Sequence, residues 1–343
     1  MLIMQPRKLL MISTDRKIFE EGSSVRARQM EYAKNWDEVH IIVFDTTKNI
    51  ETVIASNCWA YSTKSWTKFM YPFDAIRLGK FIIEKRGITD ITCQDSSLTA
   101  MAGVSLKKQF QGKSATAISL EIQIHEDIGS PNFAYNISNK IRKILSLSYL
   151  PKADHIRVVS NRIKKFLVDT LGINDSLIEV RPIMVDIEKV KNTPILPGAD
   201  LHKKYPQFQK VVLMASRLER EKNIELAIRA WKEVIKMIPK AGLIIVGRGS
   251  QSQKLQAQSR NLGLTQNIVF EPWADYSTLI SYYKSADLFL NTSLFEGYGM
   301  TLAEAKAAGC KIVSTDVGVA REAGAKIVGW EKGEVAESIV KMW

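Results

Sequence analysis

Short apolar runs alternate with stretches of helical periodicity along the chain, and this alternation constrains the fold more than any other feature. Strands are predicted in the first half at 9–12, 39–44, 88–93, 118–124 and 156–159, with helices at 25–34, 73–85, 98–109, 134–147 and 162–171. Strands are predicted in the second half at 211–214, 243–246, 267–270 and 287–291, with helices at 224–238 and 276–285. Such alternation favours parallel sheets with helices on both faces, so we predict an α/β chain with doubly wound sheets.

The length of the chain indicates two domains. At 343 residues it is long for a single hydrophobic core. Regular structure is interrupted between residues 188 and 208, where Pro194, Pro197, Gly198 and Pro206 occur. We therefore predict one Rossmann-like domain at 1–192 and a second at 193–343.

Composition excludes several classes of protein. No apolar run approaches the ~18 residues that cross a bilayer, and the first residues do not fit a secretion signal, so a cytoplasmic location is expected. The three cysteines are widely spaced and the chain has four histidines, which indicates neither a disulfide framework nor a zinc site. A net charge of +12 predicts an anionic partner. No nucleic-acid-binding signature is visible, so we expect no nucleic acid and favour lipid head groups.

Two carboxylates, Glu296 and Glu304, lie eight positions apart between a predicted strand and an Ala-rich helical run. They therefore lie at the carboxyl end of a strand, where open α/β sheets bind ligands and a helix N-terminus attracts anions. Gly297 and Gly299, between the carboxylates, allow the backbone to approach a ligand closely. Carboxylates repel phosphate but accept hydrogen bonds from sugar hydroxyls, so the segment predicts binding of a sugar joined to a phosphate.

A structural alternative exists for the same segment. Thr301, Leu302, Ala303 and Glu304 fit the capping-box pattern. In that arrangement Thr301 caps the helix and the Glu304 side chain reaches back to the backbone of the cap.

The surroundings of the two glutamates carry a family resemblance. The E-x7-E spacing, the Gly-Tyr-Gly within it and the run 307–318 together resemble the retaining glycosyltransferases of family 4, which have the GT-B fold of two Rossmann-like domains. The resemblance implies that Glu304 holds the ribose hydroxyls and Glu296 the donor sugar. It assigns donor binding to the intervening backbone as well, at Gly297, Tyr298, Gly299, Met300 and Thr301.

The resemblance extends to a predicted loop and helix start farther upstream. Arg217 follows the strand at 211–214, and Lys222 lies close to the start of the helix at 224–238. A cation at a helix N-terminus is unfavourable by ~0.3 to 1 kcal/mol, which invites a functional reason. The resemblance implies that both residues bind the donor diphosphate and act in catalysis. The alternative is a solvated surface on which they pair with Glu219 or Glu221.

Two further segments support a nucleotide site. Gly247 and Gly249 end a predicted strand, and Glu271 ends the next one. The resemblance assigns all three to donor binding. A Rossmann dehydrogenase could use the same residues, because an acidic ribose ligand is expected near Glu271. Ser252, however, occupies the position of the third glycine, and the dehydrogenase alternative leaves the two glutamates of the E-x7-E segment unexplained.

The first half resembles the family more loosely. His125 follows a predicted strand and matches a histidine that faces the donor sugar in many members, although a lone histidine there can be purely structural. Where relatives carry a Gly-Gly acceptor loop, this chain has Gly22, Ser23 and Arg26, which we assign to acceptor binding. An inverting enzyme would need a side-chain base, for which Glu126 and Asp127 are the candidates.

The predicted function is transfer of a sugar from a nucleotide-sugar to an acceptor hydroxyl, with retention and without a metal or other cofactor. The predicted acceptor is a glycan or a lipid-linked molecule. The alternatives are a sugar-nucleotide epimerase of the same fold and a non-catalytic binding protein. The segment 64–73 interleaves aromatic and cationic residues, so it predicts contact with an anionic membrane surface unless its aromatics pack in the core or line an acceptor cleft. The helical tail that returns to the first domain in relatives is expected to be short or missing.

Overall fold

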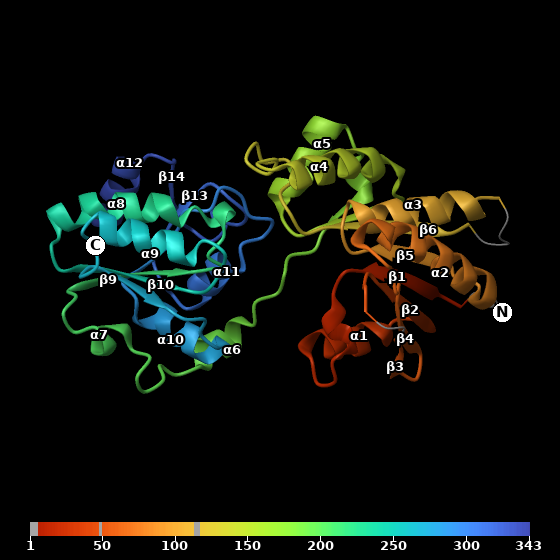
Figure 1. Cartoon of the computed structure of the whole chain (residues 1–343), viewed down its shortest axis with the longest axis horizontal. Coiled ribbons are helices and arrows are strands. Elements are labelled where there is room, and N and C mark those ends of the chain that lie inside the picture. Colours follow the sequence, from red (N-terminus) through yellow and green to blue (C-terminus); the bar gives the residue numbers. More distant parts are fainter. Residues whose placement is uncertain (1–5, 48–49, 113–116) are drawn as a thin grey trace. The chain divides into compact units, whose positions relative to one another are not determined.

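The computed structural model describes residues 6–47, 50–112 and 117–343, which form two compact units (Figure 1). The first unit ends at Arg181 and the second begins at Pro182. This division precedes the boundary expected after residue 192, because helix α6 (Ile187–Asn192) packs on the second unit. Val190 is fully buried in the core of that unit, and Lys284 Nζ donates hydrogen bonds to the carbonyls of Lys191 and Thr193.

The first unit contains one sheet whose strands run in the order β3-β4-β2-β1-β5-β6-β7-β8. Its strands are β1 (Lys8–Ser13), β2 (Glu38–Val43), β3 (Glu51–Ala55), β4 (Cys58–Ser62), β5 (Asp90–Cys93), β6 (Ser119–Ile124), β7 (His155–Val158) and β8 (Ile178–Val180). All neighbouring strands are parallel except β3, which is antiparallel to β4. The strands β3, β4 and β8 were not predicted, because β8 has only three residues and β3 and β4 form an edge hairpin with a register shift.

Helices cover both faces of the first sheet, as the alternation predicted. They are α1 (Ser24–Ala33), α2 (Tyr71–Arg86), α3 (Leu98–Phe110), α4 (Ile137–Tyr149) and α5 (Asn161–Leu171). Helices α2, α3 and α4 contact one another in succession, and Figure 1 shows α1 across the sheet from α2 and α3. Buried Leu9, Met11, Val39 and Ile41 pack beneath α1 because alternate residues of a strand face the same side.

The second unit contains a fully parallel sheet in the order β11-β10-β9-β12-β13-β14. Its strands are β9 (Lys210–Ala215), β10 (Ala241–Val246), β11 (Ile268–Glu271), β12 (Leu288–Asn291), β13 (Ile312–Thr315) and β14 (Lys326–Val328). Its helices are α6, α7 (Leu201–Lys204), α8 (Ile224–Met237), α9 (Ser252–Asn261), α10 (Tyr276–Ser285), α11 (Met300–Ala307) and α12 (Lys332–Lys341). The four strands and two helices predicted here from apolar periodicity are present.

Two apolar cores separate the helices of the second unit into layers. Val212 and Met214 face a core shared with α8 and α12, whereas Val211 and Leu213 face a core shared with α10 and α11. The strands are buried on both sides, which explains why their sequences are continuous apolar runs. No helix within the described ranges is both long and apolar enough to cross a bilayer.

Candidate active site

The strand order of the second sheet reverses between β9 and β12. Strands β10 and β11 lie on one side of β9, and β12, β13 and β14 lie on the other. Crevices outside the carboxyl ends of the strands at such a switch point are the usual ligand sites of open α/β sheets. Arg217 and Lys222 follow β9, and Glu296 follows β12. The fold therefore brings together predicted residues that are separated by about 75 positions in the sequence.

Lys222 and Glu296 form an ion pair at this switch point. Lys222 Nζ lies 2.6 Å from Glu296 Oε1, and each side chain is only 14% exposed. Ser293 Oγ lies 2.7 Å from the same carboxylate oxygen. Thr292 Oγ1 fixes the loop that carries the lysine, because it donates to the carbonyls of Lys222 and Asn223. The cation and the carboxylate are thus held in place by the protein itself.

Arg217 behaves differently from Lys222. Its Nη2 lies 2.9 Å from Glu221 Oε1, and its side chain is 66% exposed. This is the solvated pairing that we considered as the alternative for both cations. It describes Arg217, but not Lys222, which pairs across the two loops with Glu296.

The capping-box alternative is wrong. Gly299 is the N-cap of α11, with φ of 90°, and no side chain caps the helix. Thr301 lies inside the helix, and Glu304 accepts a hydrogen bond from Tyr283 rather than from the backbone of a cap. No side-chain cap therefore competes with an anion for the N–H groups of Met300 and Thr301, which lie at the positive end of the helix dipole. Glycine suits this cap because other residues rarely adopt such a φ.

Glu304 is a buried carboxylate. It is 7% exposed, and its hydrogen bond from the Tyr283 hydroxyl is long, at 3.3 Å. Burial raises the pKa of Glu304 above its usual value, because the charged form loses its hydration, and the Tyr283 hydrogen bond offsets only part of this. Burying this carboxylate with a single long hydrogen bond destabilises the folded state. Its oxygens can accept further hydrogen bonds, which a ligand could donate.

The two predicted glycines after β10 have a packing role. A Cβ at Gly247 would lie 1.9 Å from the carbonyl oxygen of Ser216, and one at Gly249 would lie 2.4 Å from that of Leu218. These glycines let the loops after β9 and β10 approach each other closely. The loop that carries Arg217 is therefore fixed against the neighbouring strand end.

Glu271 ends β11, as predicted, but its carboxylate is occupied. Lys204 Nζ lies 2.7 Å from Glu271 Oε1, and the Tyr205 hydroxyl donates to the same oxygen. In a dehydrogenase the Glu271 carboxylate would have to be free to accept hydrogen bonds from the ribose. Its pairing with Lys204 therefore weakens the nicotinamide alternative. The donor-binding assignment of Glu271 stays a prediction.

Sequence reasoning missed the polar residues that support Glu296. Asn291 Oδ1 lies 2.7 Å from Ser293 Oγ, and its Nδ2 donates to Ser314 Oγ. Thr315 Oγ1 donates to the carbonyl of Ser293 at 2.6 Å, which joins the ends of β12 and β13. The sequence signal that could have located them is the polar run Asn291, Thr292 and Ser293 at the end of an apolar strand.

The residues assigned to acceptor binding have structural partners in this structure. Ser23 Oγ caps α1 through the N–H of Arg26, and it donates to the carbonyl of Lys17. Arg26 Nη2 donates to the carbonyl of Val53 on β3, and Gly22 provides a turn with φ of 74°. Their role toward an acceptor stays a prediction.

A directional hydrogen-bond chain ends at His125. Glu121 Oε1 accepts from the Thr92 hydroxyl at 2.7 Å and from Gln123 Nε2 at 3.0 Å. The Gln123 amide is thereby oriented, and its Oε1 lies 3.2 Å from His125 Nε2. A carbonyl oxygen only accepts, so the imidazole carries its proton on Nε2 and presents Nδ1 as an acceptor. Desolvation by surrounding protein atoms and the charge of Arg157 lower the pKa of His125, which favours the neutral imidazole.

Both candidate bases for an inverting reaction are already engaged. Glu126 forms an ion pair with Arg142. Asp127 is buried and accepts a hydrogen bond from the N–H of Ser130, and burial raises the pKa of its carboxyl. Neither side chain is a free carboxylate at the strand end.

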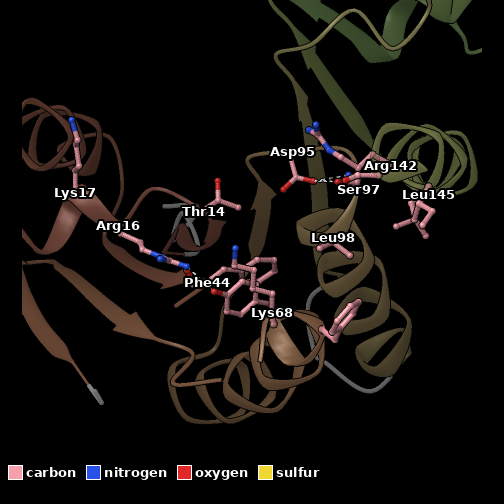
Figure 2. Close-up of a pocket in the computed structure, with 14 residues that line it drawn as sticks. Thr14, Arg16, Lys17, Phe44, Lys68, Asp95, Ser97, Leu98, Arg142 and Leu145 are labelled. Atoms are coloured by element: carbon pink, nitrogen blue, oxygen red, sulfur yellow. Dashed lines mark hydrogen bonds between the residues drawn. The ribbon is translucent and has the colours of Figure 1, made fainter. Parts of the chain in front are cut away.

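The first unit contains a cavity of about 750 Å³ that sequence reasoning did not predict. It lies where the order of the first sheet reverses, between β1 and β5, and is lined by Thr14 and Arg16 after β1 and by Asp95 and Ser97 after β5. Figure 2 shows Arg16 and Lys17 on one side of the cavity and Arg142 and Leu145 on the other. The two sheets thus carry candidate sites at equivalent points.

Part of the second unit is similar to a known protein family. Residues 200–336 match the family model described as "Glycosyl transferases group 1". The chain is 28% identical over 187 residues to alpha-monoglucosyldiacylglycerol synthase of Streptococcus pneumoniae, covering 48% of this chain and 42% of that protein. It is 27% identical over 192 residues to phosphatidyl-myo-inositol mannosyltransferase of Mycobacterium leprae, covering 54% and 48%. The chain thus spans less than half the length of these two curated relatives.

The fold is also found among solved structures. Sucrose-phosphate synthase from Thermosynechococcus elongatus superposes with a TM-score of 0.77 at 18% identity, over 98% of this chain and 89% of that chain. The two parallel-sheet units therefore have the predicted GT-B fold.

Proposed function

Because residues 200–336 match the glycosyl transferases group 1 family model, we propose that the chain transfers a sugar from a nucleotide-diphosphate sugar to an acceptor hydroxyl, with retention of configuration. The observation that carries this proposal is the ion pair between Lys222 and Glu296 beside the open N-terminus of α11. The buried Glu304 lies in the same helix, after its first turn. Together they offer a cation, free N–H groups and two carboxylates, which suits a diphosphate joined to sugars.

The leaving group in this reaction is a nucleoside diphosphate. Negative charge grows on its oxygens as the bond to the sugar breaks, so preorganised donors accelerate the step. Lys222 and Arg217 are the proposed side-chain donors, and the N–H groups between Gly297 and Met300 are the proposed backbone donors. The Lys222 ammonium has three donors, so it can contact the diphosphate without leaving Glu296. Glu296 then accepts from a hydroxyl of the donor sugar, and Glu304 from the ribose.

Retention follows when the acceptor attacks from the face that the diphosphate leaves. The acceptor oxygen bonds to the anomeric carbon, the bond from that carbon to the phosphate oxygen breaks, and the departing phosphate takes the acceptor proton. This route needs no side-chain base, which agrees with the engagement of Glu126 and Asp127. His125 would accept a hydroxyl of the donor sugar through Nδ1.

The acceptor that we propose is a glycan or a lipid-linked molecule of the cell envelope. The names of the two curated relatives refer to diacylglycerol and to phosphatidylinositol. We also propose that the chain works at the cytoplasmic face of a membrane as a peripheral protein, and that turnover needs no divalent metal. In the described part of the chain, no group of three or more acidic, histidine or cysteine residues is arranged to hold a metal ion.

A panel of nucleotide-sugars tests the proposal. The purified chain is screened by thermal shift, where a ligand at 100 times its Kd stabilises by ~2.7 kcal/mol. The stabilising donor is then incubated with candidate acceptors, and the anomeric configuration of the product is read by NMR. Retained configuration in the presence of EDTA is expected. Release of an altered sugar without any acceptor would instead identify an epimerase.

A further inference from the structure

A chain of buried polar side chains leads from the end of β13, through the end of β12, to Glu296. Ser314 and Ser293 are fully buried, and Asn291 is 7% exposed. Buried polar groups are costly unless they are hydrogen bonded, so each proton of this chain needs an acceptor. The direction of each hydrogen bond then follows from the atoms that only accept or only donate.

The Asn291 amide has one orientation in this chain. The backbone carbonyl of Thr315 only accepts, so the Ser314 hydroxyl donates its single proton to that carbonyl, at 2.7 Å. The Ser314 oxygen must then accept from Asn291, whose Nδ2 lies 3.1 Å away. Asn291 Oδ1 consequently faces Ser293, and it accepts the backbone N–H of that residue at 3.3 Å.

The Ser293 hydroxyl has two acceptors for its one proton. Its oxygen lies 2.7 Å from Asn291 Oδ1 and 2.7 Å from Glu296 Oε1. Neither oxygen can donate while Glu296 is ion-paired with Lys222, so the two compete for the same proton. Hydrogen bonds to an ionised acceptor are roughly twice as strong as neutral ones. The proton therefore goes to Glu296, and Asn291 Oδ1 keeps the backbone N–H.

The two carboxylate oxygens of Glu296 consequently differ. Oε1 accepts from the Ser293 hydroxyl and from the Lys222 ammonium, which lies 2.6 Å away. Oε2 has no hydrogen-bond or ion-pair partner among the residues that the structure describes. Two donors on different loops thus hold one oxygen of the carboxylate and restrict its rotation. They determine which oxygen remains for a ligand.

We propose that Ser293 is a positioning residue for the donor sugar. Its hydroxyl, together with Lys222, occupies Oε1 of Glu296, so that Oε2 is the oxygen that accepts a hydroxyl of the sugar. This inference rests on the proposed function, in which Glu296 contacts the donor sugar, and it adds the residue that orients this contact. Because the Ser293 side chain is fully buried, it acts through Glu296 rather than by touching the ligand.

Calorimetric titration with a pair of ligands tests this inference. UDP-glucose, UDP-galactose, UDP-N-acetylglucosamine and GDP-mannose are titrated into the parent chain, and the tightest binder is compared with its free nucleoside diphosphate. Ser293→Ala is expected to lower the affinity for the nucleotide-sugar about tenfold, because the hydrogen bond that orients the charged acceptor is lost. The affinity for the nucleoside diphosphate is expected to be unchanged, because this ligand lacks the sugar.

A double-mutant cycle and a matched control separate positioning from packing. In a Glu296→Ala background, adding Ser293→Ala should not change the affinity for the nucleotide-sugar, because the serine acts only through the carboxylate. Ser281→Ala is the control, since this hydroxyl is also fully buried and bonds to the N–H of Leu196 and the carbonyl of Ser277. The control should lower the stability without changing the affinity for either ligand.

Asn291→Ala gives a prediction of the opposite sign, and it decides the question if Ser293→Ala does not fold. Removing the competing acceptor leaves the Ser293 proton to Glu296 alone, so the affinity for the nucleotide-sugar should equal or exceed that of the parent chain. A lower affinity in Asn291→Ala would contradict the inference.

The two ligands also distinguish this inference from the proposed function. Equal losses for both ligands in Ser293→Ala, or no loss for either, would overturn the inference alone, because the hydroxyl would not act on the sugar. A parent chain that binds none of the nucleotide-sugars and neither uridine nor guanosine diphosphate would overturn the proposed function, and this inference with it.

Discussion

The two units place different side chains at the same point of the same kind of sheet. In the second unit the loops at the switch point hold an ion pair, Lys222 with Glu296, and a buried Glu304. In the first unit the loops at the switch point border a cavity with exposed apolar residues and lysines. Parallel sheets fix where a site lies, and the loops decide what it binds.

Lys222→Ala should give the largest effect and should separate the two sites. The ammonium acts on a diphosphate that becomes more negative in the transition state, so kcat is expected to fall by ~10² to 10³. Arg217→Ala is expected to lower kcat in the same range. Vesicle flotation should be unchanged in both variants. Steady-state kinetics decide, with the exposed Lys232→Ala as control. Full turnover in Lys222→Ala would remove the proposed diphosphate site.

Glu304→Gln should weaken binding of a nucleoside diphosphate by about tenfold or more, because a charged acceptor becomes a neutral one. Calorimetry measures this. Burial raises the pKa of Glu304 in the folded state, so the folded protein holds this proton more tightly than the unfolded chain does. Its contribution to stability is therefore lost as pH rises from the unfolded pKa through the folded pKa.

Glu304→Gln should consequently be at least as stable as the parent at neutral pH, and its stability should depend less on pH between the unfolded and the folded pKa of the Glu304 carboxyl. Denaturant unfolding measured at several pH values checks this. The exposed Glu331→Gln is the matched control. A lower melting temperature with unchanged nucleotide affinity would mean that the carboxylate serves the fold rather than the ligand.

Gln123→Met tests whether the Gln123 side chain sets the tautomer of His125 in the first unit. The Gln123 carbonyl holds the imidazole proton on Nε2, and a hydrogen bond of ~1 kcal/mol corresponds to about a fivefold preference between tautomers. Nitrogen NMR of the parent should show the Nε2–H tautomer and a pKa below the usual histidine value, and the variant should lose most of the tautomer preference. An Nδ1–H tautomer in the parent would contradict the hydrogen bond that His125 Nε2 is inferred to donate to Gln123 Oε1.

Ser23→Ala should give the smallest effect and should affect the fold rather than acceptor use. Removing the hydroxyl that caps α1 is expected to cost ~1 kcal/mol of unfolding free energy. KM for the acceptor should stay unchanged if the hydroxyl only caps the helix. A KM increase without loss of stability would restore the acceptor role assigned from the sequence.

Much of the fold was readable from local patterns. Buried parallel strands are continuous apolar runs, so β9, β10 and β12 could be located from the order of residues alone. The edge hairpin of β3 and β4 was missed because the burial of β3 is irregular and its pairing with β4 contains a register shift. The domain boundary was placed late, because the burial of Val190 against distant helices leaves no local signal.

The sequence by itself determined the fold class and the residue types of the proposed donor site, because these depend on periodicity, glycine positions and the spacing of Glu296 and Glu304. Only the tertiary structure decided which partners those residues have. Lys222 meets Glu296 rather than a neighbouring glutamate, Gly299 rather than Thr301 caps α11, and α4 exposes its isoleucines. The reason is that hydrogen bonds, ion pairs and burial depend on contacts between segments that are distant in the chain, which local patterns do not encode.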